Sequence, residues 1–212
     1  MKGMASEAGS VREPRYQGQG RLRMRELFRQ WIDAVNEAWQ EGRPIVHIYC
    51  GANIAELFRA FDFQVLYGEI TALQTAAKKQ SLRHIGVAEE LGYSSPDVCA
   101  YHEIEIGRMV ANLDHPLGHI PPPSLVMVSN NCVAYIKWAE FMSRHYGVPM
   151  VTIDVPYLPK LGVLYDPAEE EYQEQRRYVI RQLEEMVAAC EDLTGRRFDV
   201  DKLREHESYS NR

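Results

Sequence analysis

The stretch IVHIYCGANIAELFRAFDFQVLY, residues 45–67, decides the fold. Its first five residues, Ile45–Tyr49, form a short apolar run that predicts a buried strand, and Phe63–Tyr67 predicts a second one. Between them, Ile54–Phe61 has helical spacing, and Asn53 with Glu56 three residues on resembles an N-cap with its capping partner. Strand, helix and strand joined by short turns predict a right-handed crossover between parallel strands.

The rest of the chain repeats this alternation. In the helical segments, apolar residues recur at intervals of three and four residues. Gly92 is a typical signal for the end of a helix, and Ser95-Pro96 for the start of one. The sequence therefore predicts a doubly wound α/β fold, with a mainly parallel sheet and helices on both faces. The further segments expected are helices over Arg25–Trp39, Ala72–Leu91, Ser95 to about Leu113, Asn131–Tyr146 and Glu169–Leu193, and strands over Leu125–Val128 and Met150–Ile153.

Composition limits the classes of function. The 212 residues carry a net charge of −6, so nucleic acid and anionic membrane surfaces are not expected partners. No apolar run is long enough to cross a membrane, and the N-terminus lacks the apolar stretch of a signal peptide, so we expect a cytoplasmic protein. We expect residues 1–20 to form a flexible tail, residues 21–195 one α/β domain, and residues 196–212 the start of a connection to a second domain.

Cys99 and Cys132 are the best candidates for chemistry. Each falls where a helix is expected to begin, and a thiolate there faces the positive end of the helix dipole and unpaired N–H groups. Cys50, Cys132 and Asp154 each follow a predicted strand at the carboxyl edge of the sheet, where ligands bind in such folds. Cys50 is more simply a core residue, and Cys190, on an apolar helical stripe, is predicted to be core.

Other polar residues permit two interpretations each. Glu69 follows the second strand and is a candidate for proton chemistry at the same edge. His102, Glu103 and Glu105 follow Cys99 and form either a solvated helix face, the simpler interpretation, or acid groups of the site. His115 and His119 lie in a proline-rich loop, where their spacing does not suit zinc.

Nucleotide and hydrolase motifs are absent. The chain contains neither G-x-x-x-x-G-K-[ST] nor G-x-G-x-x-G, so we do not expect it to bind ATP itself. It also lacks the G-x-S-x-G nucleophile elbow of many hydrolases.

Several motifs together resemble the benzoyl-CoA reductase and 2-hydroxyacyl-CoA dehydratase family. The resemblance extends from about Arg43 to the end of the chain. It is carried by Leu73-Gln74, Lys78–Ser81, Ala88–Ser94, Asp97–Tyr101, Ile106-Gly107, Pro123–Leu125, Ser129–Cys132, Lys137-Trp138 and Val148–Tyr157.

The resemblance implies a [4Fe–4S] cluster, with Cys99 and Cys132 matching two of its cysteine ligands. It also implies a paralogous partner subunit, an ATP-dependent iron–sulfur activator protein, and low-potential electron transfer to an aromatic or 2-hydroxyacyl-CoA in anaerobic metabolism. Subunits of this family are about twice as long, so the chain resembles an N-terminal half, with an apolar surface that should make it associate. The alternative is a non-catalytic interaction domain of the same fold that binds no metal.

Overall fold

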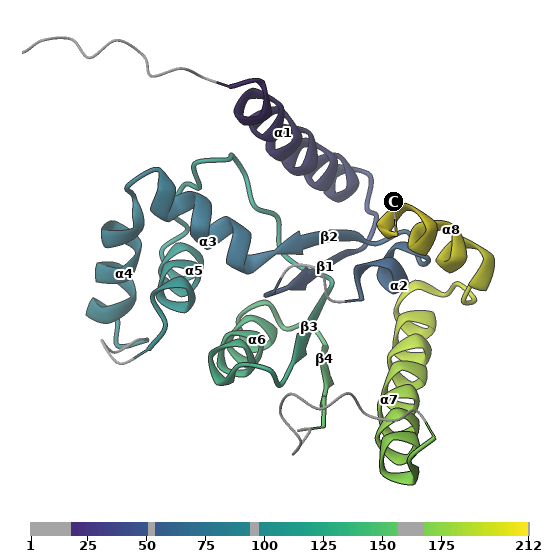
Figure 1. The fold of residues 1–212 in the computed structure, drawn as a ribbon. Coiled ribbons are helices and arrows are strands. Elements are labelled where there is room, and N and C mark those ends of the chain that lie inside the picture. The colour runs from purple at the N-terminus through teal and green to yellow at the C-terminus, as the bar shows by residue number, and fades with distance from the viewer. Residues whose placement is uncertain (1–17, 51–53, 94–97, 157–167, 212) are drawn as a thin grey trace, which may run out of the picture.

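A four-stranded parallel sheet lies at the centre of the molecule. The computed structural model describes residues 18–50, 54–93, 98–156 and 168–211 (Figure 1). Its strands are β1 (Ile45–Ile48), β2 (Gln64–Tyr67), β3 (Leu125–Ser129) and β4 (Met150–Ile153). They are arranged in the order β2-β1-β3-β4, and each recorded strand pairing is parallel. The predicted fold class is therefore confirmed.

Helices follow the strands along the chain and cover the sheet. None in the described part of the chain is long and apolar enough to cross a membrane. The helices are α1 (Gln19–Gln40), α2 (Ala55–Arg59), α3 (Gly68–Ala77), α4 (Ser81–Glu90), α5 (Ala100–Val110), α6 (Val133–Tyr146), α7 (Glu170–Thr194) and α8 (Val200–Ser210).

Successive strand residues point to opposite faces of the sheet, and both faces are buried. Val46 and Ile48 of β1 belong to a core cluster with residues of α2 and α7, which include Phe58 and Cys190. Val126 and Val128 of β3 pack on the other face, in a cluster with α5 and α6. A third cluster joins α1 to the sheet, with Ile32 and Val35 beside Ile45 and Leu66. Helices therefore cover both faces, as predicted.

The single long helix expected over Ala72–Leu91 is wrong, because the chain forms two helices there. Between α3 and α4, Lys79 adopts a left-handed conformation with φ of 59°. The amide of Gln80 then donates to the carbonyl of Thr75 at 3.0 Å, which closes the turn. Residues other than glycine, asparagine and aspartate rarely adopt positive φ, so a lysine gives no sequence signal for such a break.

The break allows α4 to pack closely on α5. A Cβ atom at Gly107 of α5 would lie 1.9 Å from the carbonyl oxygen of His84, so only glycine permits this approach. The start of α5 also differs from the expectation, because the helix begins at Ala100 with Cys99 as its N-cap and ends at Val110. The predicted helix-start residues Ser95 and Pro96, and the predicted cap Asn53, lie outside the described residues.

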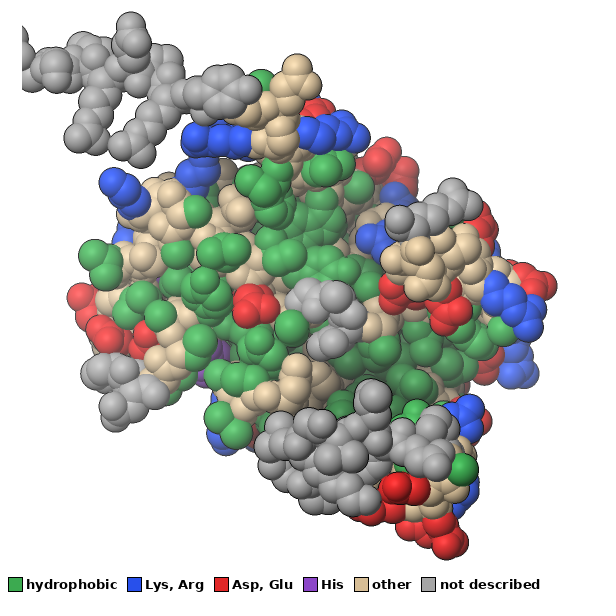
Figure 2. Space-filling model, in the orientation of Figure 1, with side chains coloured by type: hydrophobic (Ala, Val, Ile, Leu, Met, Phe, Trp, Pro, Cys, Tyr) green, Lys and Arg blue, Asp and Glu red, His purple; other side chains and the backbone are tan. Residues whose placement is uncertain are grey.

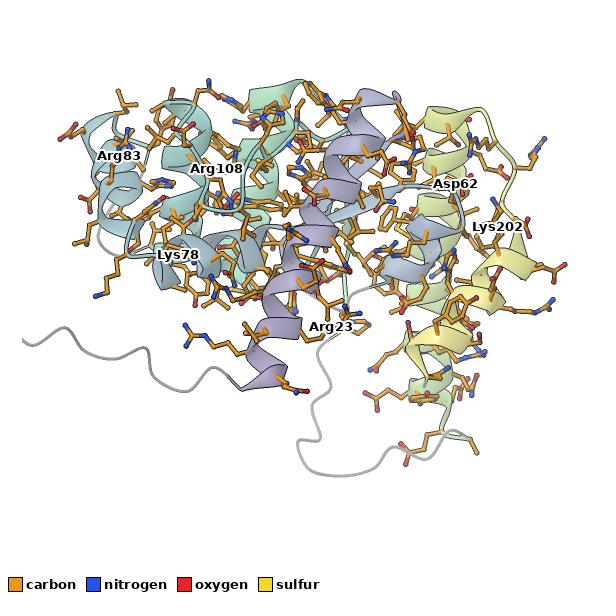
Figure 3. All side chains as sticks on the ribbon, turned by 90° about the horizontal axis from the view of Figure 1, so that it is seen from above. Arg23, Asp62, Lys78, Arg83, Arg108 and Lys202 are labelled. Atoms are coloured by element: carbon orange, nitrogen blue, oxygen red, sulfur yellow. The ribbon has the colours of Figure 1, made fainter. Side chains whose placement is uncertain are left out.

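Residues 196–211 dock onto the domain through α8. The ring of Phe198 lies 5.5 Å from that of Phe61, and Lys202 forms an ion pair with Asp62 at 3.3 Å (Figure 3). The segment expected to begin a connection therefore packs against the α/β domain.

Candidate functional site

The carboxyl ends of β1 and β3 form the edge at which the strand order reverses. The chain leaves β1 toward β2 on one side, while β3 lies on the other side of β1. In doubly wound sheets a crevice opens at this switch point. Cys50 follows β1, and residues 130–132 follow β3, so the fold brings these two segments to one place.

Three aromatic rings pack beneath this edge. The ring of Tyr49 lies 4.6 Å from that of Tyr135 and 4.7 Å from that of Trp138, which is fully buried. Gly68, the first residue of α3, lies against them, since a Cβ atom there would approach Trp138 to 2.9 Å. Burial, and then the charge of Cys99, raise the pKa of the Tyr49 hydroxyl well above its usual range. The edge therefore has an uncharged aromatic floor, formed by Tyr49, Tyr135 and Trp138.

Glu69 lies beside this floor, at the N-terminus of α3. Its amide donates to the carbonyl of Tyr49 at 2.8 Å, which fixes the start of the helix against the end of β1. The hydroxyl of Tyr135 donates to its carboxylate at 3.4 Å. The half-buried carboxylate thus reaches the edge, as the sequence predicts.

Cys50 lies at the same edge and not in a core cluster, although the sequence favours a core position. The thiol is half-buried. Burial raises its pKa, and a hydrogen bond with Tyr135 opposes this change, whereas Glu69 adds to it. Cys50, Tyr135 and Glu69 therefore form one interacting group.

Cys99 and Cys132 occupy equivalent positions, as the N-cap residues of α5 and α6. Cys99 is exposed and Cys132 is half-buried. Both lie within electrostatic range of the aromatic floor, since Cys99 acts on the pKa of Tyr49 and Cys132 on the pKa of Tyr135. In the described part of the chain, however, no three Cys, His, Asp or Glu side chains are grouped to hold a metal ion.

Cys190 does not belong to this edge. Its side chain is completely buried in the core cluster that α7 forms with the sheet. Burial raises the pKa of the thiol to about 12. The predicted core role of Cys190 is confirmed.

Asp154 connects the end of β4 to α7. Its carboxylate accepts hydrogen bonds from Asn130 and from the hydroxyl of Tyr178, the latter at 2.7 Å. Its backbone amide donates to Gln182 at 2.6 Å. These contacts hold the segment after β4 in place.

His102, Glu103 and Glu105 are buried, so the solvated helix face expected for them is wrong. Glu105 accepts a hydrogen bond from Thr71 at 2.8 Å and pairs with Arg108 at 3.0 Å. The hydrogen bond from Thr71 joins α3 to α5, whereas the buried ion pair lies within α5. The sequence signal for it was the i, i+3 spacing of opposite charges on an otherwise apolar helix.

His115 and His119 are structural. The Nδ1 atom of His115 accepts from the amide of Leu117 at 3.1 Å, so its Nε2 atom carries the proton and donates to the carbonyl of Thr71 at 2.9 Å. His119 packs its ring against Trp39 at 4.9 Å. Both side chains therefore have packing or hydrogen-bonding roles within the fold.

Comparison with known proteins identifies the family of this chain. Residues 52–212 match the family of the 2-hydroxyglutaryl-CoA dehydratase D-component. The chain belongs to this family. It is 34% identical over 179 residues to the (R)-2-hydroxyisocaproyl-CoA dehydratase alpha subunit of Clostridioides difficile, covering 84% of this chain and 41% of that protein.

Two further relatives have similar coverage. The chain is 29% identical over 188 residues to one of the subunits of benzoyl-CoA reductase from Thauera aromatica, covering 87% of this chain and 41% of that protein. It is 28% identical over 189 residues to the (R)-phenyllactyl-CoA dehydratase alpha subunit of Clostridium sporogenes, covering 86% of this chain and 42% of that protein. The chain thus spans about two fifths of the length of the curated relatives it matches.

Proposed function

We propose that this chain forms part of a subunit of an enzyme that acts on acyl-CoA thioesters, either a 2-hydroxyacyl-CoA dehydratase or a reductase of an aromatic acyl-CoA. The relatives named above are enzyme subunits of these two kinds. The observation that carries the proposal is the position of Cys99 and Cys132, which cap two helices beside one aromatic floor.

The two thiols are the proposed protein ligands of a [4Fe–4S] cluster. Thiolate sulfur is the form of cysteine that binds iron, and both side chains are at least partly accessible. Such clusters ordinarily have four cysteine ligands, so the two thiols fit a cluster only in part. Other residues or chains must supply the remaining ligands. When bound, a cluster of this kind supplies one-electron transfer at a low potential.

The other residues of the edge would prepare the surroundings of this centre. Tyr49 and Trp138 exclude water from the floor, because both are buried. Glu69, held at the start of α3, is the proposed acid or base for a proton of the substrate, and Tyr135 orients its carboxylate. We further propose a paralogous subunit and an ATP-dependent iron–sulfur activator as partners, since electrons must reach the centre from outside.

Anaerobic reconstitution with iron and sulfide tests the ligand assignment. We expect the parent chain to retain iron after desalting and to absorb light through thiolate-to-iron bands. Cys99→Ser and Cys132→Ser should each retain less iron, whereas Cys190→Ala, which alters the buried thiol of α7, should retain as much as the parent. If both serine variants hold as much iron as the parent does, the ligand assignment is wrong.

A second candidate function is a non-catalytic interaction domain that binds no metal. Within the residues described, no three Cys, His, Asp or Glu side chains are grouped to hold a metal ion, which favours this second candidate. The same reconstitution decides between the two, because an interaction domain would retain no more iron than its serine variants.

A further inference from the structure

A pocket of about 230 Å³ lies between α5 and α6. Neither the proposed ligands Cys99 and Cys132 nor Glu69 lines it. Its lining includes Tyr93, His102, Lys137, Glu140, Phe141 and Arg144.

His102 is the unusual member of this lining. Its side chain is 6% exposed, and neither ring nitrogen has a hydrogen-bond partner among the residues described. Burial lowers the pKa of the imidazole to about 4, so the ring is neutral near pH 7 and offers one donor and one acceptor. Buried polar groups normally have partners, and an unpartnered one in a pocket wall indicates that something else supplies them.

The rim of the pocket is positively charged. Lys137 and Arg144 both approach the carboxylate of Glu140, at 3.8 Å and 2.6 Å. Because two cations share one carboxylate, one positive charge remains uncompensated. Both cations are largely exposed and therefore free to turn toward an anion in the pocket mouth.

An aromatic pair forms another wall. The rings of Tyr93 and Phe141 lie 5.2 Å apart, edge to face. Tyr93 is 50% exposed and follows Gly92, at the end of α4. If its ring swings outward, a flat ligand can pack on Phe141 and reach the nitrogens of His102.

The pocket lies within reach of the proposed thiol site along the same two helices. His102 is three residues beyond Cys99 on α5, and Lys137 and Arg144 are five and twelve residues beyond Cys132 on α6. At 1.5 Å per residue, the cationic rim lies about 8–18 Å from that N-cap along the helix axis. An elongated ligand can therefore occupy both places.

We propose that this pocket binds the nucleotide end of a coenzyme A thioester, with Lys137 and Arg144 contacting phosphate, Phe141 the base, and His102 a polar edge of the base. The choice of coenzyme A rests on the proposed function. A flat ring that carries polar edge atoms and adjoining phosphates matches the three properties of the pocket: an aromatic wall, an unpartnered imidazole and excess positive charge.

Calorimetric titration of the chain with coenzyme A, ADP and inorganic phosphate tests the proposal. We expect coenzyme A and ADP to bind at the pocket, and phosphate at least tenfold more weakly. Lys137→Ala/Arg144→Ala should weaken ADP binding at least tenfold. The control Lys78→Ala/Arg83→Ala removes the same charge near α3 and α4 and should leave binding unchanged (Figure 3).

A variant at His102 separates binding from folding. His102→Leu replaces the unpartnered imidazole by an apolar side chain, so we expect its melting temperature to equal or exceed that of the parent while its ADP affinity falls at least fivefold. The proposal is overturned if the parent binds neither nucleotide, if phosphate binds as tightly as ADP, or if His102→Leu keeps full affinity. If the chain retains no iron but still binds nucleotide, the cluster assignment is refuted and the proposal for this pocket is supported.

Discussion

Replacement of Gly107 by alanine should destabilise the protein, although alanine is the better helix former. Gly107 lies inside α5, where its Cα approaches the backbone of α4. The added Cβ would lie 1.9 Å from the carbonyl oxygen of His84, whereas ordinary contacts begin at 3.4 Å. Because the obstacle is backbone and not the end of a flexible side chain, one helix must move by about 1.5 Å relative to the other.

The expected magnitude follows from two opposing terms. Overpacking of a rigid interface costs about 3 kcal/mol, the upper part of the usual range. The change from glycine to alanine in a helix interior recovers about 1 kcal/mol. The net loss of about 2 kcal/mol in the free energy of unfolding should lower the melting temperature by about 4–8 °C for a domain of this size.

Gly86 provides a matched control on the partner helix. It lies inside α4, and a Cβ atom there would meet nothing within 4 Å. Gly86→Ala should therefore raise the free energy of unfolding by about 1 kcal/mol. Urea unfolding of the two variants and the parent measures both effects. If Gly107→Ala is as stable as Gly86→Ala, the close packing of α4 on α5, which positions Cys99, is wrong.

Four further predictions concern charge, pH, chemistry and association. Arg108→Ala should lower the free energy of unfolding in urea by about 3–5 kcal/mol, because it leaves Glu105 buried without its cationic partner. A loss no larger than that of an exposed-residue variant such as Arg83→Ala would contradict the buried pair. Burial lowers the pKa of His47 to about 3 in the folded chain, so its contribution to the free energy of unfolding should be complete above about pH 6.5 and decline as the pH falls toward 3. Between pH 7 and 4.5, the free energy of unfolding of His47→Gln should therefore fall less steeply than that of the parent, and equal slopes would refute this. Glu69→Gln, which keeps the shape of the side chain, should lower kcat of the complete enzyme by about 100-fold or more without changing the melting temperature, and full activity would remove Glu69 from the chemistry. Light scattering at micromolar concentration should give a mass above the 24.4 kDa of one chain, because apolar side chains gather across the middle of the face in Figure 2; a stable monomer would contradict this.

The alternation of strands and helices could be predicted from the sequence because each short apolar run carries its own signal. All four strands lie where the apolar runs predict them, and Gly147 and Gly195 end α6 and α7 in left-handed conformations typical of helix termini. The break at Lys79 could not be foreseen, because tertiary packing of α4 on α5 imposes a conformation that the local sequence does not favour.

The site could be predicted only in part, for a related reason. The carboxyl edge follows from topology, so the sequence brings Cys50, Cys132 and Glu69 together in principle. Burial of His102 and Glu105 depends on a layer formed by several helices, and periodicity within one helix does not reveal that both of its sides are covered. The close approach of Gly68 to Trp138 likewise joins residues far apart in the chain.

Cysteine alkylation, mapped by mass spectrometry before and after anaerobic iron loading, tests the central claim most directly. Cys99 is exposed and Cys132 half-buried, whereas Cys190 is buried and should react slowly in either state. We predict that iron loading protects Cys99 and Cys132 together and that chelation restores their reactivity. Iron bound to the chain with the reactivity of both thiols unchanged would contradict the account.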